Sequence, residues 1–330
     1  MKVRELLYQV PIEDEGKNIR QIVKEQFGLV DHDISRAKYR QDGICLNGQR
    51  VFVNTQVACG DQVRIRIEDQ PNGRIVPTPG PLTILYEDDD LIAVDKPAGI
   101  VVHPSHGHYR DSLGNYIAAY YEAKGEPHDI RTIGRLDMET SGVILYGKTR
   151  SAVYLLNQQH EKGLYGKTYL ALFSGNISTP SGRFDGPIGR VPEVKLKRMV
   201  RPDGDEAHTF YEILENGPTC GLARVKITTG RTHQIRVHFA NDGHPLLGDL
   251  LYGDAENDVD SLTAAHSALA GQEGIRRAAL HCHEVHFRKP FTGEEIHLRS
   301  ALPEDMAAYI SKEMLEKIDQ PSEYKFWDGK

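Results

Sequence analysis

Two segments of the chain combine charged side chains with turn-forming residues, and both can support chemistry. The first extends from Gly134 to Gly142, in a turn-prone stretch just before an apolar strand, and it contains Arg135 and Asp137. An ionised carboxylate such as that of Asp137 can act as a nucleophile or as a general base. The same carboxylate can instead cap its own turn, and the segment taken alone favours this structural role.

The second segment extends from Gly230 to His238 and follows a strand in which apolar and polar residues alternate. Thr232 can cap a helix that ends near Asn241, and Arg231 then stands at the strand end beside the N-terminus of that helix. Active-site side chains commonly project from strand ends, although an arginine there is often part of a surface ion pair. Both interpretations stay open at this level.

The composition describes a folded chain with an uneven charge distribution. Its 330 residues are 39% hydrophobic and 26% charged, which excludes disorder as the main state and fits one large domain or about two ordinary ones. The net charge is -7, so a nucleic-acid partner has to be bound by local basic patches. Residues 17 to 66 carry nine Lys or Arg and five Asp or Glu, which makes them a separate basic unit.

Neither the cysteines nor the apolar segments indicate secretion or a membrane. The four cysteines form no CxxC pair, and the N-terminus lacks the apolar core of a signal peptide. No apolar run reaches the ~20 residues of a membrane span. We therefore expect a cytoplasmic protein. The histidines at 103 to 108 and 281 to 283 lack a HExxH or paired-cysteine signature, so we expect no metal site.

The basic unit is predicted to begin with two short helices. The first has apolar residues at helical spacing, namely Ile19, Ile22, Val23 and Phe27. The second is expected to begin at Asp33, which can cap it, and to carry Arg36 and Arg40 one turn apart. The exposed faces of these helices should therefore be cationic.

Strands follow the two helices. A hairpin is predicted at Asn47-Gly48, because these residues tolerate the positive φ of a type I′ turn, and an alternating strand at 62 to 67. The Pro- and Gly-rich stretch from about 70 to 81 should be a linker. Beyond it, apolar runs of strand length outnumber helical stretches, which predicts an α+β domain. The apolar runs lie at 91–94, 142–146 and 168–173, an alternating strand at 223–228, and the helices at 112–122, 150–161 and 303–318.

The two charged segments occur together with two further motifs, and the four resemble those of the RluA family of pseudouridine synthases. They are RLDxxTSG at 135–142, GRTHQIRVH at 230–238, the run from Leu91 to Gly99, and the run from His244 to Asp249. The resemblance extends from about residue 82 to about 308. Residues 16 to 67 separately resemble the S-four-type RNA-binding module that many large-subunit ribosomal RNA members of that family carry.

The resemblance implies a fold and a division into domains. It implies an α+β fold with a mixed, largely antiparallel central sheet, flanking helices and a central cleft, preceded by a small helix-helix-hairpin RNA-binding domain. The expected RNA-binding domain and linker comprise residues 1–77, and the expected catalytic domain comprises residues 78–330.

The resemblance also assigns roles to individual residues of the expected catalytic domain. It makes Asp137 the catalytic nucleophile, Arg231 the arginine that pairs with this aspartate, and Arg135 the residue that helps to displace the target nucleotide. Tyr169 matches the tyrosine that contacts the flipped base, and Ile235 matches an apolar position of the pocket. Gly134 is a departure, because most members have histidine before RLD. The isomerisation of uridine consumes no energy carrier and needs no redox cofactor, so we expect none.

The expected partner is RNA, most naturally ribosomal RNA, bound by a monomer that needs no membrane. RNA contacts are predicted for two sets of basic residues, Arg20, Lys24, Arg36 and Arg40 in the N-terminal unit and Lys195, Lys197 and Arg198 in the segment 183–201. The alternatives are a synthase acting on transfer RNA, an RNA-binding protein that has lost catalysis, and a carbohydrate-active hydrolase. The hydrolase would need a second carboxylate, for which Glu139 is the neighbour available.

Overall fold

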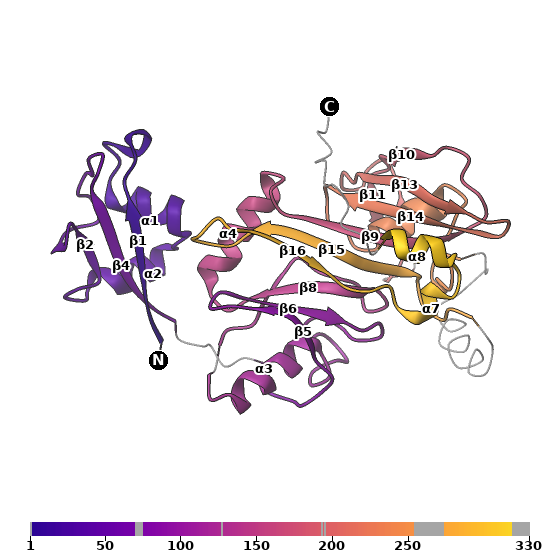
Figure 1. Ribbon diagram of the computed structural model, residues 1–330, viewed down its shortest axis with the longest axis horizontal. Coiled ribbons are helices and arrows are strands. Elements are labelled where there is room, and N and C mark those ends of the chain that lie inside the picture. Colours follow the sequence, from indigo (N-terminus) through magenta and orange to yellow (C-terminus); the bar gives the residue numbers. More distant parts are fainter. Residues whose placement is uncertain are drawn as a thin grey trace.

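The computed structural model describes residues 2–69, 75–126, 128–192, 194, 196–253 and 274–318. Its described strands form a four-stranded sheet near the N-terminus, a much larger sheet in the rest of the chain, and a separate two-stranded hairpin. Figure 1 shows the small sheet with its two helices at one end of an elongated molecule. Each of the two larger sheets has its own cluster of buried apolar residues, so each part has a hydrophobic core.

The N-terminal part packs two helices against the sheet β1-β4-β2-β3. The predicted first helix is present, and Asn18 caps it by accepting a hydrogen bond from the Gln21 backbone N–H at 3.0 Å. The predicted hairpin is also present, with φ of 50° at Asn47 and 81° at Gly48. The elements are β1 (Lys2–Gln9), α1 (Ile19–Phe27), α2 (Asp31–Lys38), β2 (Ile44–Leu46), β3 (Gln49–Arg50) and β4 (Gln62–Asp69).

The second helix differs from the prediction at both ends. Gly28, with φ of 63°, ends α1, and the link to the next helix is so short that α2 already begins at Asp31 rather than at Asp33. The helix ends at Lys38. Arg36 is therefore in its last turn, whereas Arg40 lies beyond the helix, so the two arginines do not repeat on one helical face.

The large sheet has the strand order β10-β13-β14-β9-β15-β8-β6-β5, with β16 beside β15 and β7 beside β8. The described strand pairs are antiparallel except β15 with β8, which confirms the mixed, largely antiparallel sheet. The strands are β5 (Thr83–Glu87), β6 (Leu91–Lys96), β7 (Arg131–Ile133), β8 (Ser141–Gly147), β9 (Gly166–Ser174), β10 (Ser181–Phe184), β13 (Thr209–Asn216), β14 (Cys220–Ile227), β15 (Leu280–Arg288) and β16 (Glu295–Arg299).

The parallel pairing of β8 with β15 depends on a glycine. Gly142 has φ of 107°, and a Cβ built on it would lie 2.2 Å from the backbone oxygen of Cys282. Because glycine has no Cβ, the two strands can approach this closely at the start of β8. The loop that carries Asp137 leads directly into this strand, so the close pairing fixes where the loop ends.

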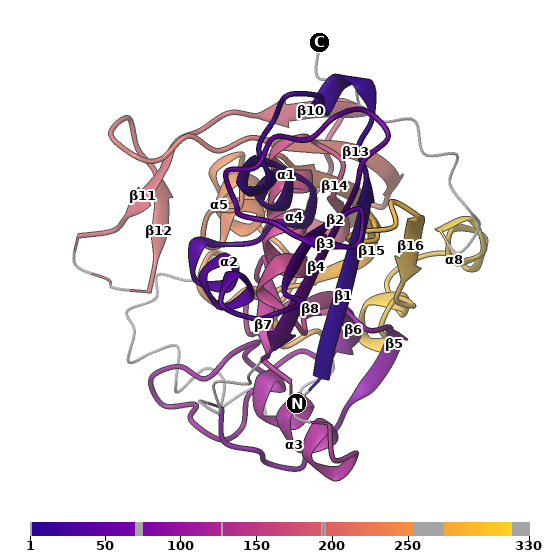
Figure 2. The same ribbon diagram turned by 90° about the vertical axis from the view of Figure 1, so that its left-hand side faces the viewer.

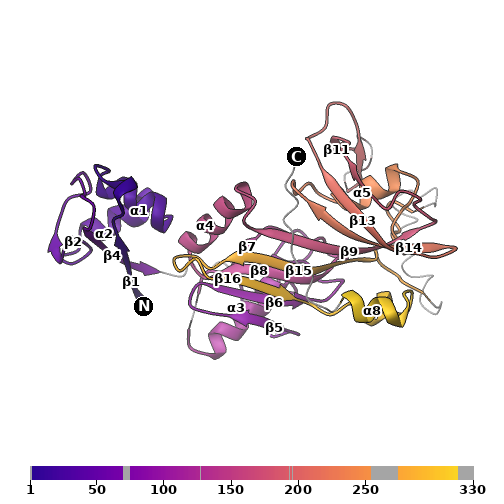
Figure 3. The same ribbon diagram turned by 45° about the horizontal axis from the view of Figure 1, so that its top comes forward.

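Helices lie at the edges and on the faces of the large sheet (Figures 1 and 3). The predicted helix 150–161 is confirmed as α4 (Arg150–Glu161), and α3 (Leu113–Ala123) follows Ser112, whose side chain caps it. The predicted single helix at 303–318 is wrong. It is divided into α7 (Glu304–Ala307) and α8 (Lys312–Ile318), because Ser311 Oγ accepts a hydrogen bond from the Met314 N–H at 3.1 Å and so begins a new helix.

The two parts of the chain touch through α4 and the turn between β15 and β16. A Cβ added to Gly28 would lie 2.6 Å from the Tyr154 ring, and Phe291 packs against the N-terminal apolar cluster. Figure 2 looks along the molecule from the N-terminal end, with α1 and α2 in front of α4. Among the described helices, none is long and apolar enough to cross a membrane.

Candidate active site

A cavity of about 610 Å³ opens in the large sheet, where several loops and strands meet. It is lined by the loop 133–137 before β8, by β9, by the loop 229–233, and by the start of α5 (Gln234–Asn241). A separate hairpin of β11 (Ile188–Arg190) and β12 (Arg198–Val200) also contributes to the wall, and it projects from the sheet in Figure 2. A volume of this size is typical of sites for small ligands.

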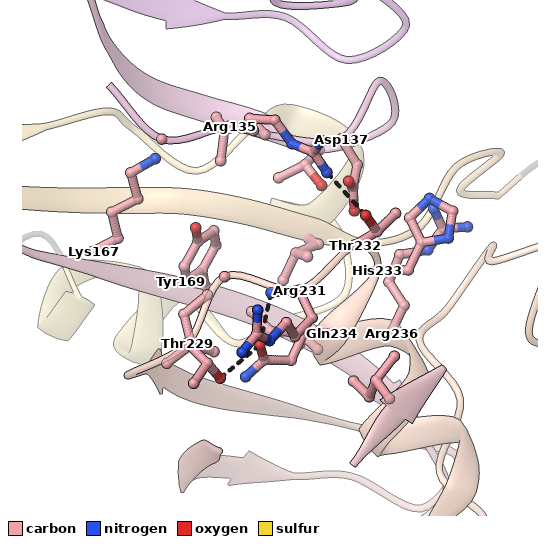
Figure 4. A pocket seen from close by; sticks show the side chains of 18 of the residues that line it. Arg135, Asp137, Lys167, Tyr169, Thr229, Arg231, Thr232, His233, Gln234 and Arg236 are labelled. Carbon is pink, nitrogen blue, oxygen red and sulfur yellow. Dashed lines mark hydrogen bonds between the residues drawn. The ribbon is translucent and has the colours of Figure 1, made fainter. Parts of the chain in front are cut away.

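The cavity brings together the residues that the resemblance pointed to in the catalytic part. Asp137, Arg135, Tyr169, Arg231 and Ile235 all line it, although they come from three separate regions of the chain. Figure 4 shows the loop with Asp137 on one side of the cavity and the loop 229–233 on the other. The structure therefore brings these five residues together in one cavity. Their individual roles stay predictions.

A buried lysine fixes the loop that carries Asp137. Lys96, which is fully buried, donates hydrogen bonds from Nζ to the backbone oxygens of Pro97, Ile100 and Met138 at 2.9, 2.7 and 2.9 Å. Burial lowers the pKa of its ammonium to about 7, although the nearby carboxylate of Asp137 acts in the opposite direction. Lys96 thereby joins the loop after β6 to the residue that follows Asp137.

Opposing influences act on the ionisation of Asp137. Burial raises the pKa of its carboxyl above the ordinary value, and this influence is the largest. The cations of Arg236, Arg135 and Lys96 lower the pKa and so limit the rise, while the carboxylate of Asp249 adds to it. Asp137 is therefore a partly buried acid whose charge is compensated by cations from three different segments.

The arginine that acts most strongly on Asp137 is Arg236, and it is held in place by carboxylates. Its Nε and Nη2 donate to the two oxygens of Asp249, both at 2.7 Å, and Nη2 lies 3.0 Å from a Glu139 oxygen. The side chains of Arg236 and Asp249 are 4% and 0% exposed. This bidentate geometry fixes the plane of the guanidinium group beside Asp137.

Arg231 does not have the role that the resemblance implied. In Figure 4 it points away from Asp137, and its Nε donates to the backbone oxygen of Glu206 at 3.0 Å. The expected pairing of Arg231 with Asp137 is therefore wrong in this structure, and Arg236 has that place. The physical reason is that Arg231 precedes α5 and lies on the wall of the cavity opposite Asp137. Arg236 is on α5, where its hydrogen bonds to Asp249 fix its orientation.

The start of α5 also differs from the expectation. The residue before the helix is His233, with φ of 58°, and Thr232 does not cap it. Instead, Thr232 Oγ1 accepts a hydrogen bond from Arg135 at 3.0 Å, which connects the two loops across the cavity. Gln234 stabilises the turn, because its side-chain oxygen accepts from the Thr229 hydroxyl at 2.9 Å and from the Arg231 N–H at 3.1 Å.

Tyr252 joins the β11–β12 hairpin to the entrance of α5. Its hydroxyl accepts a hydrogen bond from the Arg198 N–H at 2.9 Å and lies 2.9 Å from Nδ1 of His233. Burial lowers the pKa of His233 to about 3, so its ring is neutral near pH 7. Arg236 also lies over the Tyr252 ring, 5.2 Å from its centre. The position of the hairpin is thus connected to the active-site arginine.

The predicted RNA-binding residues fall in different surroundings. Arg198 lines the cavity, and Lys197 lies 5.8 Å from the centre of the Tyr252 ring, whereas Lys195 is outside the described residues. Arg20 is exposed and Lys24 is half-buried, but both form ion pairs with Asp31, at 2.6 and 2.9 Å. The cationic face of α1 is therefore partly neutralised by the start of α2.

His281 and His283 of β15 are buried residues that form hydrogen bonds. Nδ1 of His281 lies 2.9 Å from the Ser141 hydroxyl, and Nε2 of the same ring lies 3.1 Å from the backbone oxygen of Ser300. Nδ1 of His283 lies 2.7 Å from that same oxygen. In the part of the chain that the structure describes, no three His, Cys, Asp or Glu side chains gather as metal ligands would.

Known proteins share the sequence as well as the fold. The family model for RNA pseudouridylate synthase matches residues 90–241. An uncharacterized RNA pseudouridine synthase of Bacillus subtilis is 36% identical over 80% of this chain and 82% of its own length. The ribosomal large subunit pseudouridine synthase D of Pasteurella multocida is 32% identical over 92% of this chain and 93% of its own length.

The chain belongs to the RluA family of RNA pseudouridine synthases. A solved structure of the human protein RNA pseudouridylate synthase domain containing 1 superposes with a TM-score of 0.54 at 22% identity, over 73% of this chain and 96% of that one, and so shares the fold. The chain is therefore an isomerase of the pseudouridine synthase type.

Sequence reasoning missed three polar residues of this synthase site. Arg236, Lys96 and Asp249 all lie inside the quoted motifs, but their types alone did not distinguish them from ordinary surface charges. The sequence did contain an indication of their importance. Three charged residues lie within mostly apolar or turn segments, and a charged residue that is buried must find a partner. Which partners they find depends on how the motifs meet in the fold.

Proposed function

We propose that this synthase converts uridines of large-subunit ribosomal RNA to pseudouridines, with Asp137 as the catalytic nucleophile. The observation that carries the proposal is the position of Asp137 in a cavity beside Tyr169 and Ile235, with the Arg236 guanidinium acting on its charge. The ribosomal target is supported by the relatives named ribosomal large subunit pseudouridine synthase D, which match nearly the whole chain.

The reaction suits a site with one carboxylate. It breaks the bond between the ribose C1′ and N1 of uracil, turns the base, and forms a new bond to C5, while the proton on C5 leaves and N1 gains one. The Asp137 carboxylate can add to the base or to the ribose, or take a proton from the sugar. The atoms balance within the substrate and water, so the proposal includes no cofactor.

The uridine must leave its stack to reach Asp137. Arg135 lies at the cavity and is joined to Thr232 on the opposite wall, a position from which it can fill the space of the displaced nucleotide. The Tyr169 side chain, 4% exposed, provides an aromatic surface for the extruded base. Stacking on an aromatic ring contributes about 1–3 kcal/mol, which partly offsets the few kcal/mol of unstacking.

RNA contacts are proposed for two regions outside the cavity. Residues 1–77 are proposed as an RNA-binding domain with its linker and 78–330 as the catalytic domain, since each part has its own sheet and core. The β11–β12 hairpin supplies Lys197 and Arg198 near the cavity, where they can hold RNA phosphates. We also propose a monomeric enzyme of the cytoplasm, because one chain supplies the described cavity and the proposed substrate is ribosomal RNA.

The test compares the wild type with Asp137→Asn on transcripts of large-subunit ribosomal RNA and of transfer RNA. The wild type should form pseudouridine in the ribosomal transcript without added cofactor, as mapped by carbodiimide adducts and primer extension. Asp137→Asn should be inactive while it still binds RNA. Asp242→Asn, which changes an exposed acid at the end of α5, is the matched control and should stay active.

Each alternative function has a distinct outcome in this assay. An inactive wild type that binds RNA would support the RNA-binding protein without catalysis, and modification of the transfer RNA alone would redirect the substrate. Activity in Asp137→Asn would remove this aspartate as the nucleophile. Release of free uracil or of a sugar would indicate a hydrolase, although the second carboxylate that it needs, Glu139, is occupied by Arg236.

A further inference from the structure

Lys167 is a charged group of the cavity that the proposed reaction does not use. It lies on β9 two residues before Tyr169, so both side chains project from the same face of the strand, about 7 Å apart along it. Figure 4 shows Lys167 and Asp137 on opposite sides of the labelled group, with Tyr169 between them in this view. The ammonium thus lies at the wall of the cavity that β9 forms, on the same side as the Tyr169 ring.

No carboxylate of the described residues forms an ion pair with Lys167. Burial lowers the pKa of its ammonium, and burial also raises the pKa of the nearby Cys282 thiol to about 12. His160 lines the same part of the cavity, and its pKa is lowered by burial and by the charge of Lys167. The described residues thus place a thiol and an imidazole beside the ammonium, but no carboxylate that forms an ion pair with it.

Gly134 allows the ammonium to lie against the catalytic loop. A Cβ built on Gly134 would lie 3.1 Å from Nζ of Lys167, and the φ of this glycine is 69°. Because glycine has no side chain, the space beside the backbone is open to Lys167. The positive charge of Lys167 therefore lies at the start of the loop 134–137. An RNA strand that places its uridine at Asp137 passes within reach of this charge.

We propose that Lys167 binds a phosphodiester group of the RNA strand that carries the target uridine, which makes this end of the cavity a phosphate subsite. The inference rests on the proposed function and adds to it. A desolvated ammonium is stabilised by an opposite charge, which a phosphate provides and a neutral uracil carbonyl does not.

The experiment measures RNA affinity as a function of salt in the Asp137→Asn background, so that turnover does not interfere. Each phosphate that a cation neutralises contributes about 0.7–0.9 to the slope of log K against log salt. Lys167→Met should therefore bind a ribosomal RNA fragment more weakly, with the slope reduced by about this amount, while Lys167→Arg should retain the slope. Lys317→Met, which removes an exposed lysine of α8 at 61% side-chain exposure, should change nothing.

Two results would overturn the phosphate subsite. One is an unchanged salt slope in Lys167→Met, and the other is a lowered kcat with unchanged KM in the otherwise wild-type enzyme, which would indicate contact with the reacting base. Lys167→Gln provides the same test if the methionine variant does not fold, as judged by thermal melting. Failure of the proposed function is a separate result, because it is an inactive wild type, whereas this subsite is measured by binding.

Discussion

At the scale of single residues, the site depends on how a partly buried carboxyl is kept able to ionise. Burial raises the pKa of Asp137, and the cations of Arg236, Arg135 and Lys96 act against that rise. Arg236 is itself held by Asp249 and Glu139, so its positive charge interacts with these two carboxylates as well as with Asp137. Removing one partner of such a buried pair leaves an uncompensated charge, at a cost of about 3–5 kcal/mol. The carboxylates around Arg236 thus stabilise the protein as well as the site.

The pH dependence of catalysis follows from the same pKa. The proposed nucleophile must be ionised to react, so the rate should be full above the pKa of Asp137 and should be lost as the pH falls through it. Because the pKa is raised, the loss should begin at a higher pH than for an exposed aspartate, whose pKa is about 3.9. Single-turnover rates from pH 4 to 8 would show this acidic limb. His233 does not contribute in this range, because its pKa is about 3, whereas Lys96, with a pKa of about 7, loses its charge only toward the upper end of the range. An acidic limb that begins no higher than that of an exposed aspartate would contradict the raised pKa.

At the scale of elements, the site is placed by the junction of β8 with β15. The catalytic loop enters β8 at Ser141, and the parallel register pairs His281 with Ser141 and Cys282 with Gly142. Antiparallel neighbours on the far sides of both strands complete the frame. The helix α5 then brings Arg236 to the cavity from its first turns. The loop of Asp137 is thus positioned by strands in the middle of the sheet, which are the most buried part of the molecule.

The element-scale prediction concerns Gly142→Ala. The added methyl group meets the Cys282 backbone at 2.2 Å with a φ of 107°, so the strands must separate. We expect a loss of about 2–5 kcal/mol in the free energy of unfolding, from overpacking and from backbone strain together. Gly163→Ala is the control, because its φ is also positive, at 68°, but no atom lies within 4 Å of the new Cβ. It should lose only about 1–2 kcal/mol. Equal losses in chemical denaturation would show that the close strand contact is unimportant.

At the scale of the whole molecule, two hydrophobic cores are joined through a small contact. The N-terminal core gathers around α1, α2 and the four-stranded sheet, and Phe291 is the residue of the β15–β16 turn that packs against it. The basic residues of the N-terminal part lie outside the described cavity lining. Removal of the N-terminal part should therefore affect the binding of structured RNA without removing the residues that act on the uridine.

Removal of residues 1–77 is the prediction at this scale. The shortened enzyme should bind structured ribosomal RNA more weakly and with a flatter salt dependence, because fewer counterions are released. It should still modify a short RNA that contains the target uridine, since the cavity residues begin at Ile133. Affinity at several salt concentrations and the rate on the short RNA provide the measurements, with circular dichroism as the check of folding. An unchanged salt slope would mean that the N-terminal basic residues do not contact RNA.

The sequence by itself determined the features that depend on neighbours along the chain. The helix at 150–161 and the hairpin at Asn47-Gly48 follow from capping and from residues that accept a positive φ. The motifs also identified the residues of the cavity, because their resemblance to a family is carried by local strings of residues. Local spacing could not show that α2 begins at Asp31 or that Ser311 divides the last helix, since those boundaries depend on a short link and on a cap.

Only the tertiary structure decided which charges meet. Arg231 and Arg236 are five positions apart in one motif, and no local rule tells which of them acts on Asp137. The choice is made by Asp249, a residue of another motif, which is buried and accepts two hydrogen bonds from the arginine that α5 turns toward it. Burial and the interactions between charges distant in the sequence are properties of the folded chain. The direction in which the pKa of Asp137 shifts could therefore not be deduced from the amino-acid sequence.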